Sequence, residues 1–166
     1  MNVLIRPWKP EDAPALSAIA NNKKLWDMLR DRFPHPYTLT AAEEWIALCN
    51  EKKAPEHLCI EAGGTVCGGI GFIPGTDVEK RSAEMGYFVG EPFWGKGIAT
   101  NAVALLLEQL MEQKQFIRVF SIVFSNNPGS MRVLQKNGFS LEQIRKKAVF
   151  KNDVVLDDYV WVRFTG

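Results

Sequence analysis

The sequence is poor in the side chains that usually bind metals. Its 166 residues include only two histidines, His35 and His57, and three cysteines, Cys49, Cys59 and Cys67. None of the five stands at a metal-ligand spacing, and the odd number of cysteines does not suit a disulfide framework. We therefore expect no bound metal, and we expect the three thiols to be reduced and buried in the core.

The sequence also lacks a strong net charge and any long apolar run. Its 20 Lys and Arg against 19 Asp and Glu give a net charge of +1 without a separate basic block, which disfavours nucleic acid and anionic membranes as partners. No stretch approaches the roughly 18 apolar residues of a membrane span, and no signal peptide opens the chain. These absences predict a cytoplasmic protein with a small partner, as a monomer or a homodimer.

The composition is that of an ordinary globular domain. Hydrophobic residues make up 46% and charged residues 23% of the chain, enough apolar side chain for one core and too few residues for two domains of usual size. We found no repeat, low-complexity tract or linker. The sequence therefore predicts a single domain over residues 1–166.

Hydrophobic periodicity predicts helices and strands in a mixed order. A capping box at Thr40 and Glu43 marks one helix start, and strands 58–62, 65–73 and 82–89 are predicted to form an antiparallel meander. The remaining predicted strands are 3–6, 116–124, 139–145 and 157–164, and the predicted helices are 12–22, 23–30, 40–52, 98–114 and 128–136.

The first hairpin of the meander predicts where two thiols lie. A two-residue turn at 63–64 would place Cys67 opposite Ile60 and Cys59 opposite Gly68. Because successive side chains of a strand point to opposite faces, this register predicts Cys59 and Cys67 on opposite faces of the sheet.

A glycine-rich turn at residues 90–100 follows the strand 82–89 and opens directly into the helix 98–114. Gly95 and Gly97 have no Cβ, so an anion can approach the backbone, and the first N–H groups of a helix have no intrahelical acceptor. The pattern predicts a phosphorylated ligand that is bound mainly by main chain.

Two familiar phosphate-binding loops do not fit this turn. The triphosphatase P-loop needs Ser or Thr after its lysine to hold magnesium, and here Gly97 follows Lys96. The dinucleotide fingerprint needs a third small residue where Thr100 stands, and an acidic ribose ligand where Asn126 stands. A nucleotide hydrolase therefore ranks third, after the two functions proposed at the end of this subsection.

Taken in order, several segments resemble the GNAT superfamily of N-acetyltransferases, and within it the RimJ/RimL-like branch. The resemblance covers almost the whole chain, and each segment alone is weak. The segments are Ile5-Arg6-Pro7, Pro36-Tyr37-Thr38, Ala83-Glu84-Met85-Gly86-Tyr87, 93–100 (Phe-Trp-Gly-Lys-Gly-Ile-Ala-Thr) and 127–139 (Asn-Pro-Gly-Ser-Met-Arg-Val-Leu-Gln-Lys-Asn-Gly-Phe).

The resemblance implies an α/β (α+β) fold: one GNAT-like domain with a central mixed, mostly antiparallel sheet of six to seven strands and about four flanking helices. It implies acetyl-CoA as cosubstrate, with the pantetheine arm paired along the strand 84–89. Trp94 stands where the superfamily has Gln or Arg. The implied pyrophosphate site comprises the amides of Gly95, Lys96, Gly97, Ile98, Ala99 and Thr100.

Acetyl transfer to an amine requires a neutral nitrogen. An alkylammonium with a pKa near 10.4 lies about 3.4 units from neutrality at pH 7, a cost of roughly 4 to 5 kcal/mol, so a general base is expected. Glu84 is the candidate base and amine contact, and Gly86 on the same strand face leaves room for the substrate. The alternative is that Glu84 only pairs with a cation such as Arg81.

The oxyanion of the reaction needs a donor, and the departing thiolate needs an acid. The predicted oxyanion donor is a backbone N–H near Phe88 or Val89. The resemblance implies that Asn127 bonds the pantetheine amide and that Ser130 lies near the sulfur, although both residues also suit a helix N-terminus. Many superfamily members have a tyrosine acid where this chain has Leu134, so Ser130 or water is left as the acid.

The loop 33–38 resembles the acceptor-site segment of the branch, so His35 and Tyr37 are candidate substrate contacts, with packing of the loop as the alternative. The leading hypothesis is an enzyme that moves an acetyl group from acetyl-CoA to a primary amine, either a protein N-terminus or a small molecule, in a ternary complex. The alternative is a non-catalytic module that binds acyl-CoA.

Overall fold

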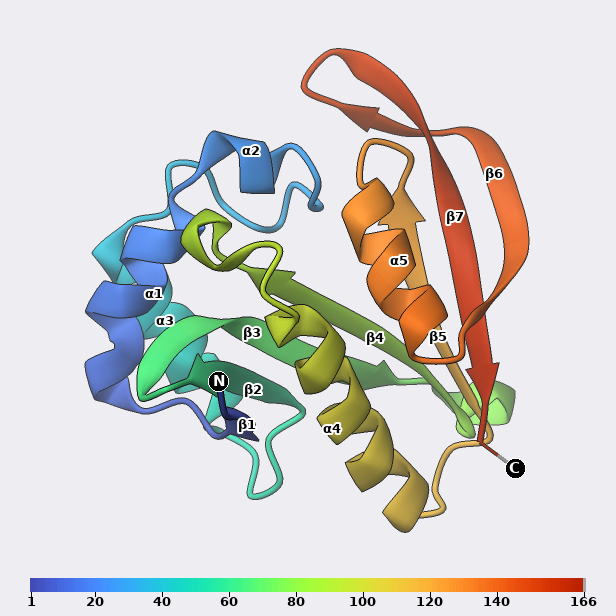
Figure 1. Cartoon of the computed structure of the whole chain (residues 1–166), viewed down its shortest axis with the longest axis horizontal. Coiled ribbons are helices and arrows are strands. Elements are labelled where there is room, and N and C mark those ends of the chain that lie inside the picture. The colour runs from blue at the N-terminus through green and yellow to red at the C-terminus, as the bar shows by residue number, and fades with distance from the viewer. Residues whose placement is uncertain (166) are drawn as a thin grey trace.

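A seven-stranded mixed sheet forms the centre of the computed structural model, which describes residues 1–165 (Figure 1). The strand order is β1-β2-β3-β4-β5-β7-β6, and only the β4–β5 pair is parallel. This confirms the predicted mixed, mostly antiparallel sheet. The strands are β1 (Val3–Arg6), β2 (His57–Ala62), β3 (Thr65–Pro74), β4 (Ser82–Val89), β5 (Arg118–Phe124), β6 (Ser140–Lys151) and β7 (Val154–Phe164).

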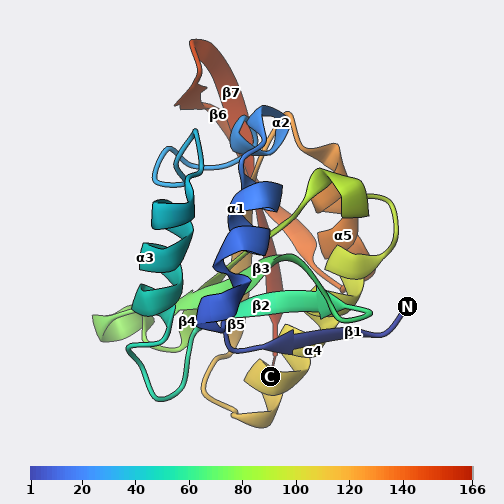
Figure 2. The same ribbon diagram turned by 90° about the vertical axis from the view of Figure 1, so that its left-hand side faces the viewer.

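Helices cover both faces of the sheet. On the β1–β4 part, α1 and α3 lie on one face and α4 lies on the other, and α5 packs beside α4 (Figures 1 and 2). Residues 1–165 form five α-helices, one more than the predicted count of about four. The helices are α1 (Ala13–Ala20), α2 (Lys23–Trp26), α3 (Leu39–Cys49), α4 (Ile98–Glu112) and α5 (Pro128–Lys136). Among them, none has the length and hydropathy needed to cross a membrane.

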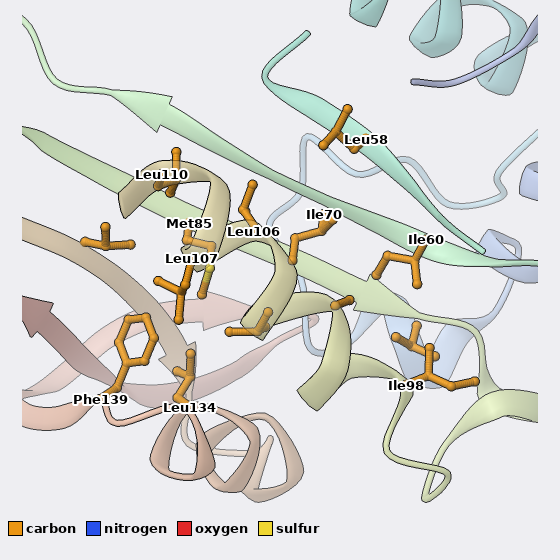
Figure 3. Packing of buried hydrophobic residues seen from close by; sticks show 14 of the residues in the cluster. Leu58, Ile60, Ile70, Met85, Ile98, Leu106, Leu107, Leu110, Leu134 and Phe139 are labelled. Atoms are coloured by element: carbon orange, nitrogen blue, oxygen red, sulfur yellow. The ribbon is translucent and has the colours of Figure 1, made fainter. Parts of the chain in front are cut away.

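Two hydrophobic cores lie on the two sides of the sheet. On one side, the predicted stripe of α4 is buried against the sheet together with Leu134 and Phe139 of the α5 region (Figure 3). On the other side, α1 and α3 close a second core around Trp8 and Ile46. The buried α4 residues include Val103, Leu106, Leu107 and Leu110, as the helical spacing predicts.

The predicted capping box of the third helix is wrong. The N-cap of α3 is Thr38, whose hydroxyl accepts a hydrogen bond from Ala41 N–H at 3.1 Å, so Thr40 lies inside the helix. Thr38 has the same capping chemistry as Thr40, and its extended backbone follows directly from the loop. The helix also ends at Cys49, earlier than the predicted residue 52.

The thiols lie on opposite sides of the sheet as predicted, but the predicted register is wrong. A bulge between Ile60 and Glu61 pairs Cys59 with Gly69 instead of Gly68. The extra residue of a bulge shifts every later pair by one position. Cys59 belongs to the core under α1 and α3, whereas Cys67 belongs to the core under α4, and both thiols are free.

The last hairpin is longer than predicted, and the second predicted helix is shorter. β6 runs on to Lys151 and β7 begins at Val154, whereas the sequence predicted strands only over 139–145 and 157–164. The missed residues include the largely exposed apolar runs 148–150 and 154–156, in which apolar and polar residues do not alternate. The second helix ends at Trp26 rather than near residue 30, because turns replace it after Trp26.

A partly buried ion pair between Arg6 and Asp12 holds the segment that follows β1. Arg6 Nη1 lies 2.7 Å from Asp12 Oδ2, and the same carboxylate accepts Lys9 N–H at 2.8 Å. Burial raises the pKa of Asp12, but the hydrogen bonds from Arg6 and Lys9 outweigh it and hold the pKa below its usual value.

We expect Asp12→Asn to lower the free energy of unfolding at neutral pH by about 1 to 3 kcal/mol, because it leaves the partly buried guanidinium of Arg6 with Glu61 as its remaining charged partner. A carboxyl with a lowered pKa stabilises the fold above the unfolded value near 3.9 and loses that contribution as the pH falls below it. The difference from the original protein should therefore persist down to about pH 4 and then shrink. Urea unfolding across pH measures it, with Glu56→Gln in an exposed Lys52 pair as the control.

Candidate functional site

The parallel strands β4 and β5 separate after a short paired stretch. Their pairing covers only Ser82–Glu84 against Arg118–Phe120. Beyond it, β4 continues along β3 to Val89, and β5 continues along β7 to Phe124. Figure 1 shows the two strands diverging toward α2 and α5. The divergence opens one edge of β4 in the middle of the sheet.

Backbone groups of Tyr87 and Val89 face this opening. Gly90 N–H donates to Cys67 O of β3 at 2.8 Å, and because strand residues alternate, Tyr87 and Val89 point their N–H and C=O groups away from β3. Val89 O accepts the indole N–H of Trp94 at 2.6 Å. Among residues 1–165, no group accepts Val89 N–H, and the N–H and C=O of Tyr87 have no partner.

Phe88 lies two residues before Gly90, so its backbone N–H and C=O also point toward β3. Of the two predicted oxyanion donors, Val89 faces the opening and Phe88 does not. The ring of Phe88 instead lines a cavity on the α1–α3 side of the sheet. A ligand with an extended, amide-containing arm would find one free strand edge here, as in strand addition.

The glycine-rich turn lies at the end of this edge. Gly95 and Gly97 have φ of +73° and +75°, which favours glycine. A Cβ at either position would meet no heavy atom within 4 Å, so the space above both residues is open. Within the described chain, the N–H groups of residues 95–100 have no hydrogen-bond acceptor. The turn and the N-terminus of α4 thus present free N–H groups that can bind an anion.

The other residues predicted around the turn occupy different positions. Trp94 ties the turn to β4 through its indole, and the Lys96 ammonium lies 5.8 Å from the Phe93 ring. Ile98 is buried in the core, and Thr100 O accepts the Asn137 side-chain amide at 3.1 Å. Ala99 packs partly against the same core. The side chains of Trp94 and Ile98 are thus engaged within the protein, whereas the backbone N–H groups of residues 95–100 stay free within the described chain.

A cavity of about 580 Å³ lies between the diverging strands and the segment that follows α2. Gly71 and Gly86 lie side by side in register in its lining. A Cβ at Gly86 would meet nothing within 4 Å, which confirms that this position is open. Aromatic rings make up much of the wall, from Trp8, Phe33, Tyr37, Trp45 and Phe88.

Glu84 lines this cavity at the point where β4 and β5 part. Its nearest cation is Arg30, with Nη2 at 3.9 Å from Oε1, and the carboxylate accepts no hydrogen bond from residues 1–165. The alternative pair with Arg81 does not form, because the Arg81 side chain points to Gln115 O at 3.5 Å. Glu84 therefore forms only a loose ion pair, with another cation than Arg81, and faces a cavity.

Asn127 and Ser130 lie at the N-terminus of α5 and also line the cavity. The Oδ1 of Asn127 caps the helix by accepting Ser130 N–H at 3.2 Å, as the capping alternative predicts. The side-chain NH₂ of Asn127 donates to no group in the described part of the chain. Capping therefore leaves Asn127 with donors for a ligand carbonyl.

Tyr87 is a site residue that the sequence did not predict, and its hydroxyl lies 2.7 Å from Ser130 Oγ and 3.1 Å from Ser130 O. Burial raises the pKa of Tyr87, and the hydrogen bond with Ser130 opposes that shift only partly. The phenol is therefore protonated at neutral pH. Leu134, at the position of the superfamily's tyrosine, is wholly buried in the core. The alternation of side chains along a strand could have shown that Tyr87 and Glu84 lie on opposite faces of β4. It could not have shown that the Tyr87 hydroxyl contacts Ser130.

Of the two substrate-contact candidates in the loop, the structure brings one to the cavity. Tyr37 lines it, its ring 5.0 Å from Phe33, and burial raises its pKa to about 12. His35 is exposed and stacks on Trp26 at 5.4 Å, outside the lining. The loop backbone turns the His35 ring outward, and the sequence of the loop does not reveal this orientation.

His57, which the sequence predicted neither as a metal ligand nor as a site residue, lines the cavity. Its ring lies 5.1 Å from Trp45, and burial lowers its pKa, so the imidazole is neutral at pH 7. The only sequence signal for this placement was the position of His57 at the start of a predicted strand. Its pairing with Gly71 is seen only in the structure.

Comparison with known proteins places these features in a family. Residues 2–140 match the acetyltransferase (GNAT) domain family. The SPbeta prophage-derived uncharacterized N-acetyltransferase YokL of Bacillus subtilis is 25% identical over 158 residues, 94% of this chain and 86% of that protein. The ribosomal-protein-serine acetyltransferase of Escherichia coli is 32% identical over 96 residues, 57% of this chain and 54% of that protein.

A solved structure agrees with the fold. The structure of Mycobacterium smegmatis RimJ in complex with CoA-disulfide superimposes with a TM-score of 0.85 at 25% identity, covering 98% of this chain and 81% of that one.

Proposed function

The chain belongs to the GNAT acetyltransferase family, a family of acyltransferases, and on that premise we propose that it transfers the acetyl group of acetyl-CoA to a primary amine. The open edge of β4 leading to the free amides of residues 95–100 carries this proposal. A strand edge suits the amide-containing pantetheine arm, and a helix N-terminus suits its pyrophosphate. The CoA-disulfide in the similar RimJ structure supports the same cosubstrate.

The residues around the opening supply what the reaction needs. Glu84 takes a proton from the attacking amine, the nitrogen bonds to the thioester carbon, and the C–S bond breaks to release CoA thiolate. Val89 N–H faces the opening, where it can donate to the developing oxyanion. Both substrates must be bound together for this direct attack. The cavity beside Glu84 holds the amine, and the β4 edge holds the thioester.

The thiolate receives its proton through hydroxyl groups of this chain. Ser130 donates to the departing sulfur, and Tyr87 donates in turn to Ser130 Oγ, which lies 2.7 Å away. Tyr87 acts through Ser130 and is thus a positioning residue. The Tyr87–Ser130 pair thus takes the role of the tyrosine acid that other superfamily members have at the position of Leu134.

The proposal is tested by mixing the protein with acetyl-CoA and a panel of amino acids, polyamines, aminoglycosides and peptide N-termini, and by measuring free CoA thiol. Release that depends on an amine is expected. Tight CoA binding in calorimetry without thiol release across the panel would instead establish the alternative, a module that binds acyl-CoA without turnover.

The phosphate turn gives a sharper prediction. We expect Gly97→Asp to weaken CoA binding at least about tenfold, a loss of about 1.4 kcal/mol, because it places a carboxylate over the anion site. Gly64→Asp is the matched control, since Gly64 has φ of +79° and equally open space but lies in the β2–β3 turn. Calorimetry with CoA measures both, and equal affinities in the two variants would contradict the assignment.

A further inference from the structure

The cavity that holds Glu84 is mainly apolar and aromatic. The Phe33 ring lies 5.2 Å from Phe88 and 5.0 Å from Tyr37, and Trp45 packs against His57 across the same space. A volume of about 580 Å³ is within the range of small-molecule sites, and walls of this kind bind apolar groups. The lining therefore suits an amine that carries a large apolar side chain.

Two exposed arginines also line this cavity. Arg30 and Arg32 line it, and neither side chain makes a hydrogen bond to any group in residues 1–165. The carboxylates in the lining are Glu84 and Glu44, and His57 is neutral. Cations without hydrogen-bonded partners beside an apolar cavity suit a ligand anion, which Arg binds through two parallel N–H groups.

The spacing of these charges matches one small chemical group. Arg30 Nη2 lies 3.9 Å from Glu84 Oε1, so a ligand that engages both carries its ammonium and its anion close together. An α-amino acid does so, because its nitrogen and its carboxylate share one carbon. A peptide N-terminus presents a neutral amide at the same place and leaves Arg30 without an anion.

The segment that carries the two arginines is held by the tip of the β6–β7 hairpin. Lys151 Nζ donates to Asp31 at 2.8 Å and lies 3.5 Å from the Trp26 ring centroid, and Lys151 is itself buried. Asn126 donates to Asp27 O at 3.0 Å from the other side. These contacts place Arg30 over the cavity on a fixed backbone (Figure 1 shows α2 above the opening).

We propose that the acceptor is a free α-amino acid with a large apolar or aromatic side chain, and this rests on the proposed acetyl transfer. Its amine lies at Glu84, its carboxylate pairs with Arg30 under the added field of Arg32, and its side chain enters the aromatic wall. Acetylation forms the N–C bond of an N-acetylamino acid, the amine loses one proton to Glu84, and CoA leaves as its thiol.

The test compares kcat/KM, measured as CoA thiol release, for L-phenylalanine, L-phenylalaninamide, glycine and a peptide that begins with phenylalanine. Phenylalanine is expected to exceed each of the other three by about tenfold or more, as a charge-assisted hydrogen bond or a filled apolar pocket gives. Arg30→Gln should remove the preference for phenylalanine over its amide. Arg81→Gln, outside the cavity, should leave that preference unchanged.

A second measurement separates this inference from the proposed function. Calorimetry of L-phenylalanine and of its amide against the protein saturated with CoA needs no turnover. Preferential binding of phenylalanine without thiol release would support the inference and overturn acetyl transfer. Equal or better turnover of the amide or the peptide would keep acetyl transfer and overturn the inference, as would failure of phenylalanine to bind.

Discussion

Replacing Glu84 with glutamine is expected to lower the turnover of acetyl-CoA by about 10²- to 10⁴-fold, the usual contribution of a general base. The carboxylate lines the cavity where β4 and β5 part and has no hydrogen bond within residues 1–165 that would tie it to a structural role. Glutamine keeps its shape but neither takes a proton nor titrates. The acidic limb of the rate profile should therefore flatten as well.

Steady-state kinetics across pH measures this effect, and calorimetry with CoA should show unchanged cosubstrate affinity. Glu43→Gln is the control, because Glu43 is an exposed carboxylate on α3 that does not line the cavity. A Glu84→Gln enzyme with the original rate and the original pH profile would remove Glu84 as the base and leave a water molecule or His57 to be examined.

The second large effect is expected at the hydroxyl pair. Tyr87→Phe and Ser130→Ala should each lower kcat about tenfold to a hundredfold, as the loss of a hydrogen bond to a developing charge predicts, with little change in KM. Because both hydroxyls serve one thiolate, the double variant should be hardly slower than Ser130→Ala alone.

Tyr87→Phe keeps the ring that packs against the core, so its melting temperature should stay close to that of the original protein. Tyr159→Phe is the control, since Tyr159 packs against the same core outside the cavity lining. Fully additive losses in the double variant would show two separate roles. An unchanged kcat in Tyr87→Phe would leave Ser130 or water alone as the source of the proton.

Much of the fold could be predicted because local patterns in this chain agree with its tertiary packing. The α4 stripe, the meander of β2, β3 and β4, and the cap at Asn127 all depend on periodicity or on residues a few positions apart. The errors arose where a neighbour offered equal chemistry, as with Thr38 and Thr40, or where a bulge changed the count of residues in β2.

The sequence by itself determined the family, the sheet and the glycine-rich turn, because glycines with positive φ and the amides that follow them are properties of a short continuous segment. Only the tertiary structure decided which side chains meet. It joined Tyr87 to Ser130, placed Arg30 rather than Arg81 beside Glu84, and turned His35 away from the cavity. The contacts of Tyr87 with Ser130 and of Arg30 with Glu84 link segments distant in sequence, and they lie where β4 and β5 part, which no local pattern specifies.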